Sequence, residues 1–248
     1  MKKTLSILNL IVVIAIIYWN YYTAAVGFNG NDIGSLSNKY RNLFTPASYA
    51  FSIWGLIFIG LIALTGYMSY SAFKSEESNG WIDKIGWSLL IANICNGLWT
   101  YAWLMEMTGV SVMIMLCILC CLLYALKTML KIDASTWLVK VPIGIYAGWI
   151  SVATIANVAA HLNKTEWRPI LSEINWTLAM IVIAALINIY VVKWKGVRSY
   201  GAIGVWALLA VSLRHWELIP VIQWTALASA VAIGLAIVNV SISNKLKA

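Results

Sequence analysis

The amino-acid sequence predicts an all-α integral membrane helical bundle. Of its 248 residues, 62% are hydrophobic and 10% are charged, and the mean hydropathy is +0.83. A soluble domain of this size would have too few polar side chains to cover its surface. The chain also contains repeated apolar runs of about 20 residues, the length that crosses the hydrocarbon core of a bilayer as a helix.

Eight spans are predicted from these runs. The first follows Met1-Lys2-Lys3 and is similar to a signal peptide, but its apolar run is long enough to span, so we expect a retained helix. The seventh is the shortest and ends at the polar segment 214–217. In chain order the spans are 4–26, 49–72, 86–106, 109–127, 138–161, 175–193, 200–214 and 219–241.

The distribution of positive charge predicts the orientation. Most of the 17 Lys and Arg lie at the two termini and in every second loop. The alternate loops hold only Lys39, Arg41, Lys164, Arg168 and Arg214. By the positive-inside rule we expect both termini in the cytoplasm, with the bundle in a bacterial-type cytoplasmic membrane. Topology and anionic headgroups then explain the net charge of +8, and no basic stripe indicates binding to nucleic acid.

Three polar segments centred on tryptophan interrupt the apolar spans, at 45–54, 93–99 and 149–157. Asn, Thr and Trp are costly in hydrocarbon unless they pair with one another or line a site. Five indoles are predicted to lie deep in the spans, and each needs an acceptor for its N–H group. They are Trp54, Trp99, Trp103, Trp149 and Trp206.

The side chains of each polar segment fall on one face of its helix, at about 100° per residue. The faces comprise Phe51, Trp54 and Phe58; Ala92, Asn93, Asn96, Trp99, Thr100 and Trp103; and Tyr146, Trp149, Ala153 and Asn157, with His161 at the end. Two interpretations stand for the amides of Asn96 and Asn157: they bind a ligand, or they hold neighbouring helices together.

Ordinary catalytic or metal-binding chemistry is not indicated. No paired carboxylates, nucleophile–base pair or central ionisable group occurs in the spans, which argues against acid–base catalysis and against ion-coupled transport. Cys95, Cys117, Cys120 and Cys121 lie at membrane depth without an accompanying His or carboxylate, so no metal site is expected. Photochemistry of a bound ligand needs none of these groups and stays an alternative.

Taken together, the three segments resemble those of the TspO/MBR family, the tryptophan-rich sensory or translocator proteins. Pro46 to Trp54 is similar to the family's proline-to-tryptophan start of the second helix. Asn96-Gly97-Leu98-Trp99 resembles the Asn-x-x-Trp element of the third helix. Residues 149–157 resemble the Trp-x-x-x-Ala-Thr-x-x-Asn element of the fifth. The order and the long first loop match as well.

The chain also departs from the family pattern. Thr45 replaces the first proline of the usual pair, and Phe58 stands where a tyrosine often follows the second-helix tryptophan. The resemblance covers about 1–165, so we predict a TspO-like five-helix core there and additional transmembrane helices over 166–248 in the same bundle. Small residues at every fourth position of the last span favour close packing on the core or a homodimer. They are Ala226, Ala230 and Gly234, and Ala228, Ala232 and Ala236.

The resemblance implies an apolar pocket closed by the first loop, with Pro46 stiffening the loop and Tyr40 or Phe44 over the mouth. Family members bind porphyrins and other tetrapyrroles, and some bind sterols. No resident cofactor is required, and a porphyrin or haem-like molecule is the expected ligand. The residues expected to line the pocket are Pro46, Phe51, Trp54, Asn96, Trp99, Trp103, Tyr146, Trp149, Ala153 and Asn157.

Three functional classes remain open. The first is a sensor, regulator or scavenger that binds a lipophilic aromatic ligand within the membrane. The second is a passive transporter of a lipophilic small molecule. The third is an enzyme for light-dependent porphyrin degradation, in which the family's tryptophans at the positions of Trp54 and Trp149 are implicated.

Overall fold

The computed structural model describes residues 1–74, 80–131, 137–167 and 171–245. Within these ranges the chain is helical and forms no strand, which confirms the predicted all-α bundle. Arg168 lies outside the described residues. The elements are α1 (Lys2–Ala25), α2 (Ile33–Lys39), the 3₁₀ helix η1 (Ser48–Ser52), α3 (Ile53–Lys74), α4 (Gly80–Leu104), α5 (Thr108–Lys131), α6 (Trp137–Lys164), α7 (Glu173–Lys195), α8 (Arg198–Arg214) and α9 (Pro220–Lys245).

Every predicted span corresponds to one long helix in the described part of the chain. Six helical segments there are long and apolar enough to cross a membrane: α1, η1 with α3, α5, α6, α7 and α9. The other two long helices are α8, which has 17 residues, and α4, which carries Asp83 in its first turn. Large apolar side chains such as Ile59, Met113 and Leu186 are exposed on the outer faces, as a lipid-facing surface requires.

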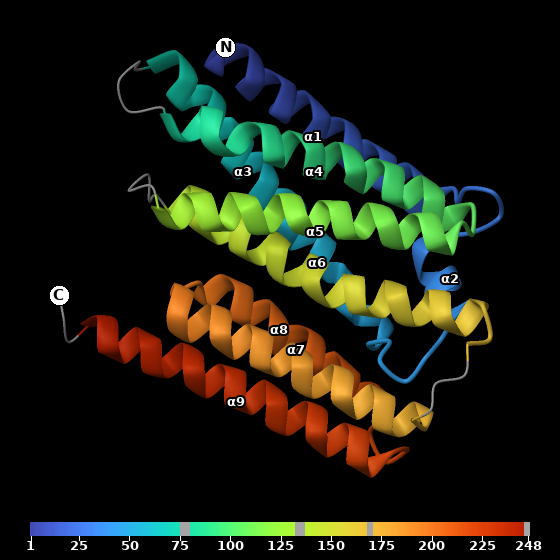
Figure 1. Cartoon of the computed structure of the whole chain (residues 1–248). Coiled ribbons are helices and arrows are strands. Elements are labelled where there is room, and N and C mark those ends of the chain that lie inside the picture. Colours follow the sequence, from blue (N-terminus) through green and yellow to red (C-terminus); the bar gives the residue numbers. More distant parts are fainter. Residues whose placement is uncertain (75–79, 132–136, 168–170, 246–248) are drawn as a thin grey trace.

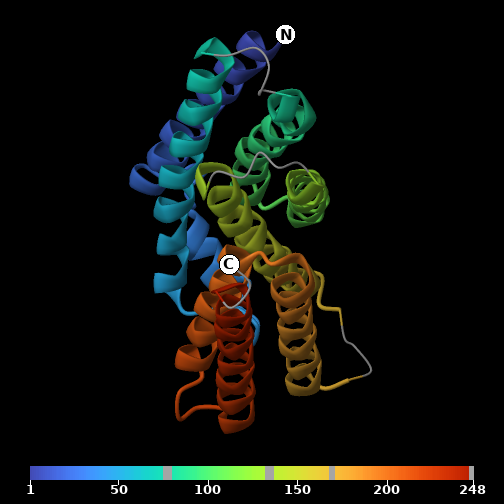
Figure 2. The ribbon, with the colours of Figure 1, turned by 90° about the vertical axis from the view of Figure 1, so that its left-hand side faces the viewer.

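The helices run back and forth as neighbours (Figure 1), and α1 packs against α3 and α4, while α5 packs between α4 and α6. α7, α8 and α9 pack against one another, and α8 joins them to α6 (Figure 2). One cluster of buried apolar residues extends from Val13 in α1 to Ile233 in α9. Ala226 and Ala230 are buried in that cluster, whereas a Cβ at Gly234 would meet no neighbour within 4 Å.

The chain termini and the short helix α2 lie at opposite ends of the bundle. α1 begins and α9 ends at the same end, and α2 lies at the opposite one (Figure 1), which we call the α2 end.

The two ends of α7 are capped. At its start, the Ser172 hydroxyl accepts a hydrogen bond from the backbone N–H of Asn175. At its end, Gly196, with φ 70°, adopts a left-handed conformation that terminates the helix.

Several polar side chains join neighbouring helices at membrane depth. The Asn9 amide on α1 donates to the carbonyl of Gly86 on α4 at 3.1 Å, and the Tyr200 hydroxyl on α8 donates to the hydroxyl of Ser151 on α6 at 2.7 Å. Each contact satisfies a polar group that lipid could not satisfy, and interhelical hydrogen bonds of this kind hold membrane bundles together.

Gly148 sets the close approach of α6 to α8. A Cβ at this position would lie 2.8 Å from the backbone oxygen of Tyr200 and 3.1 Å from Cβ of Ile203. The first of these atoms belongs to the backbone of α8, so it cannot give way by a rotamer change. The helices approach this closely only because residue 148 has no side chain.

We predict that Gly148→Ala separates α6 from α8 and lowers the free energy of unfolding by about 1–3 kcal/mol through overpacking. Gly66→Ala is the matched control, because a Cβ at Gly66 in α3 would meet nothing within 4 Å. That control should hold or slightly raise stability, since alanine is the better helix former. Thermal unfolding in one detergent compares both with the parent, and equal midpoints for the two variants would contradict the packing described.

Candidate functional site

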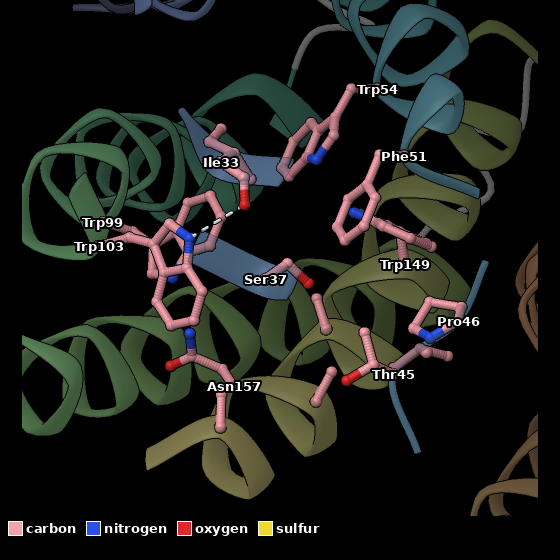
Figure 3. Close-up of a pocket in the computed structure, with 14 residues that line it drawn as sticks. Ile33, Ser37, Thr45, Pro46, Phe51, Trp54, Trp99, Trp103, Trp149 and Asn157 are labelled. Carbon is pink, nitrogen blue, oxygen red and sulfur yellow. Dashed lines mark hydrogen bonds between the residues drawn. The ribbon is translucent and has the colours of Figure 1, made fainter. Parts of the chain in front are cut away.

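A cavity of about 50 Å³ lies at the α2 end of the bundle, between α3, α4 and α6 (Figure 3). We call it the main cavity. α2 and the segment that leads to η1 cover it. Its lining residues are Ile33, Ser37, Thr45, Pro46, Phe51, Trp54, Trp99, Trp103, Trp149, Val152, Ala153, Ala156, Asn157 and Ala160. None of them is charged, so the cavity is an apolar chamber with a few polar atoms.

Five of its fourteen lining residues are aromatic. Trp54 on α3 stacks on Trp99 of α4, with ring centroids 6.4 Å apart and planes at 25°. Trp99 stacks in turn on Trp103, at 6.3 Å and 15°. Across the cavity, the rings of Phe51 and Trp149 meet edge to face at 6.1 Å. Three helices therefore contribute rings to one surface, on which a flat aromatic molecule can stack.

The polar side chains of the lining are four indoles, two hydroxyls and one amide. Nε1 of Trp99 and of Trp149 are buried without a hydrogen-bond partner among the described residues. Nε1 of Trp103 donates to the Ile33 carbonyl at 3.4 Å. Oδ1 of Asn157 accepts from the Ser111 hydroxyl at 2.8 Å, so the amide of Asn157 joins α5 to α6 and also lines the cavity. Unpaired indole donors suit a ligand that carries hydrogen-bond acceptors.

The structure brings together most of the residues predicted from sequence. Those in the lining are Pro46, Phe51, Trp54, Trp99, Trp103, Trp149, Ala153 and Asn157. Asn96 and Tyr146 are not among them. Both are buried, and neither side chain has a hydrogen-bond partner among the described residues. The Tyr146 ring lies edge-on to Trp54, with centroids 6.3 Å apart, and so supports the aromatic wall from behind.

Some lining residues were not predicted. Val152, Ala156 and Ala160 lie on the same face of α6 as Ala153 and Asn157, so the helical period could have identified them. Ile33 and Ser37 belong to α2, which no apolar periodicity reveals. The Asp32 carboxylate caps the start of this helix by accepting hydrogen bonds from the backbone N–H groups of Gly34 and Ser35, and it forms a capping box with Ser35.

The segment 26–52, which includes α2 and η1, forms the roof of the main cavity, and we call it the roof segment. Tyr40 and Phe44, expected over the mouth of the pocket, are not among the lining residues: Tyr40 binds Glu106, and Phe44 is buried in the apolar core. The amide N–H of Thr45 donates to the Asn42 carbonyl at 3.2 Å. A proline at this position would have no N–H to donate, which gives a physical reason for the departure from the family's double proline.

α8 fastens the second half of the roof segment. Each hydrogen bond uses a backbone group of the roof, and the Tyr49 ring adds an edge-to-face contact with Trp206 at 5.3 Å. The contacts are Nε2 of His215 to the Leu43 carbonyl (2.8 Å), Nη1 of Arg214 to the carbonyls of Thr45 (3.0 Å) and Pro46 (3.2 Å), the Ala47 amide to the Ala210 carbonyl (3.1 Å), and Nε1 of Trp206 to the Ala50 carbonyl (3.1 Å).

Residues at the ends of α4 and α6 fasten the first half. Glu106, between α4 and α5, accepts hydrogen bonds from the Lys39 ammonium at 2.8 Å and from the Tyr40 hydroxyl. These two bonds hold the pKa of the Glu106 carboxyl below its usual range. The amide of Asn31 donates to the Leu104 carbonyl at 3.1 Å, and that of Asn163 to the Arg41 carbonyl at 3.4 Å.

Within the described ranges, no group of three or more His, Cys, Asp or Glu comes together as metal ligands would. The sulfur atoms of Cys95 and Cys117 lie 3.8 Å apart, between α4 and α5. Neither residue lines the main cavity.

We predict that Glu106→Gln loosens the roof at neutral pH, because it removes the charge that Lys39 and Tyr40 bind. Tryptic cleavage after Lys39 should become about two- to fivefold faster, as expected for one partly exposed ion pair. Glu166→Gln is the matched control: Glu166 also has a positive φ in a loop between helices, but among the described residues its carboxylate forms no ion pair with the roof. Equal cleavage rates in the two variants would contradict the role of Glu106.

The contact of Glu106 with Lys39 and Tyr40 also predicts that the attachment of the roof depends on pH. Because the folded-state pKa of Glu106 is lowered, its stabilisation of the roof is present above the ordinary carboxyl pKa of about 4.3 and is lost as pH falls through the lowered value. Hydrogen exchange in residues 31–41, corrected for its intrinsic pH dependence, should accelerate in that window in the parent. Acceleration of the same size in Glu106→Gln would assign the effect to another group.

Comparison with known protein families matches residues 6–239 to the TSPO-like protein family. The match runs from α1 into α9, so it includes the C-terminal helices as well as the three tryptophan-centred segments. No curated protein and no solved structure matches the chain. A family match over nearly the whole length, together with the helical membrane bundle, shows that this chain belongs to the TSPO-like family of integral membrane proteins.

Proposed function

We propose that this protein binds a lipophilic aromatic ligand in the main cavity and acts as a sensor, regulator or scavenger of that ligand. The observation that carries the proposal is the convergence of Trp54, Trp99 and Trp149 on one uncharged cavity, with two indole N–H groups left unpaired. Burying a polar group without a partner costs about 1–3 kcal/mol, and a ligand acceptor would remove that cost.

The chemistry of the lining narrows the ligand class. Stacked rings favour a flat aromatic molecule, and the free donors favour one with carbonyl or similar acceptors. No cation lines the cavity, so the carboxylates of a porphyrin would have to lie at the roof, where Lys39, Arg41 and Lys164 are found. A tetrapyrrole, with its ring among the indoles and its acidic groups toward these cations, is the ligand we propose first.

Size sets a condition on binding. Pockets that hold drug-sized ligands measure about 300–1,000 Å³, much more than the main cavity. A tetrapyrrole therefore fits only after aromatic side chains have moved. Rotating side chains is the least costly way to gain space, because it leaves the helices in place.

Light-dependent porphyrin degradation is a second candidate function. The stacked series Trp54, Trp99 and Trp103 favours it, because indoles in contact with one another would adjoin a ligand that absorbs light. Passive transport of a lipophilic molecule is an alternative use of the same cavity. Flux across vesicles without retention of the ligand would favour transport, and loss of porphyrin absorbance under light would favour degradation.

We predict saturable quenching of tryptophan fluorescence when protoporphyrin IX is titrated in the dark into the detergent-purified protein. Trp54→Phe and Trp149→Phe should each weaken the apparent affinity about three- to tenfold, because each loses an indole surface and an N–H donor. Trp194→Phe is the matched control, since Trp194 is exposed on the outer face of α7.

The control separates binding in the cavity from partition into detergent. Quenching that never saturates, or affinities that are equal in all four proteins, would exclude the main cavity as a tetrapyrrole site. The deep indoles and amides would then serve packing, and flux assays with lipophilic solutes would be the next test.

A further inference from the structure

A second and larger cavity lies beside the main one. Its volume is about 430 Å³, which is within the range of pockets that hold drug-sized ligands. We call it the side cavity. It is formed by the last turns of α1, the start of α2, and η1 with the start of α3. The lining residues are Ile17, Asn20, Tyr21, Ala24, Asp32, Ile33, Gly34, Ser48, Phe51, Trp54 and Phe58.

The side cavity is open at the outer surface of the bundle. Tyr21 is 71% exposed, and Ala24 is exposed one turn later on the same helix. Tyr18, Trp19 and Tyr22 stack on one another in the same part of α1, and amphipathic aromatic residues near the end of a transmembrane helix are typical of the membrane interface. The opening therefore faces the bilayer at the depth where amphipathic aromatic molecules concentrate.

Three residues line both cavities, namely Ile33, Phe51 and Trp54. The partition between the two spaces therefore includes side chains that face both of them. The rings of Phe51 and Trp54 are only partly buried, and among the described residues the indole N–H of Trp54 makes no hydrogen bond. Changing the rotamer of either ring would break its contacts with neighbouring rings, such as those of Trp54 with Trp99 and of Phe51 with Trp149, but no hydrogen bond.

The roof is a less favourable way into the main cavity. Moving the roof segment would break the bonds from Arg214, His215 and Trp206 on one side and the Glu106 cluster on the other. Several of these bonds involve a charged group, and such bonds are stronger than neutral ones. Access from the side needs new rotamers of only two rings, whereas access through the roof needs many hydrogen bonds to break at the same time. We therefore expect a ligand to enter from the side of the bundle, which we call lateral access.

We propose that the side cavity is a vestibule through which a flat lipophilic molecule passes from the bilayer into the main cavity, with Trp54 and Phe51 as the movable partition. This inference rests on the proposed function, because it concerns the route of the same ligand. The aromatic wall of the vestibule suits an aromatic ring system, and its polar edge, with Asn20 and Asp32, suits a ligand that carries a few polar groups.

Ala24→Trp tests the route, because an indole at this position would fill the vestibule opening. Full-length protein in lipid nanodiscs is mixed with protoporphyrin IX carried in protein-free vesicles, and quenching is followed over time. A blocked route raises the barrier without altering the bound state. Association and dissociation rates should therefore both fall by about tenfold or more, while the dissociation constant stays nearly unchanged.

Ala25→Trp is the matched control. Ala25 is the next residue of α1, is also exposed, and does not line the vestibule. Both of its rates should equal those of the parent. Should Ala24→Trp fold poorly, Ala24→Cys and Ala25→Cys replace the two tryptophan variants, in a background without the four native cysteines. Each is labelled after folding with a bulky maleimide, and the rates of the labelled protein are compared with those of the same protein before labelling.

The outcomes separate the two proposals. Absence of saturable binding in the parent overturns the proposed function. Binding with unchanged rates in Ala24→Trp overturns the vestibule, as does an altered dissociation constant with an unchanged association rate. Faster association in Ala24→Trp would mean that a lipid chain normally occupies the side cavity, and faster association in Glu106→Gln would mean access through the roof. Either result also overturns lateral access.

Discussion

A polar side chain inside a membrane must find a partner, and the arrangement of this bundle depends on how each one does so. Asn9, Ser111 and Tyr200 donate to groups on neighbouring helices and thereby fix the packing of α1, α5 and α8. The indoles of Trp99 and Trp149 remain without a partner. Other buried groups, such as the side-chain amide of Asn93, are also unpaired among the described residues, but Trp99 and Trp149 line the main cavity, so theirs are the donors that the proposed ligand would meet.

The C-terminal helices take part in holding the roof of the main cavity. Gly148 lets α8 pack closely against α6, and Arg214, at the end of α8, then reaches the backbone of the roof. The roof is held in this way by a helix outside the expected five-helix core. A fastened roof shifts the least costly opening from the α2 end to the side of the bundle, where Trp54 and Phe51 separate two cavities.

The sequence predicts those parts of the molecule that follow from local patterns. Apolar runs identify all the long helices of the described chain, and helical periodicity identifies the buried faces that carry Trp99 and Asn157. α2 could not be predicted in this way, because a short helix capped by Asp32 has no apolar period. The attachment of Arg214 to the roof depends on contacts between residues about 170 positions apart, which no local pattern encodes.

The most direct test of this account observes the unpaired donors themselves. In protein labelled with ¹⁵N at the tryptophan indoles, with resonances assigned by single Trp→Phe variants, protoporphyrin IX should shift the indole N–H signals of Trp99 and Trp149. The signal of Trp206, whose N–H already binds the Ala50 carbonyl, should move much less. Shifts confined to indoles on the lipid-facing surface, or no shift at Trp99 and Trp149 at saturating ligand, would contradict the account.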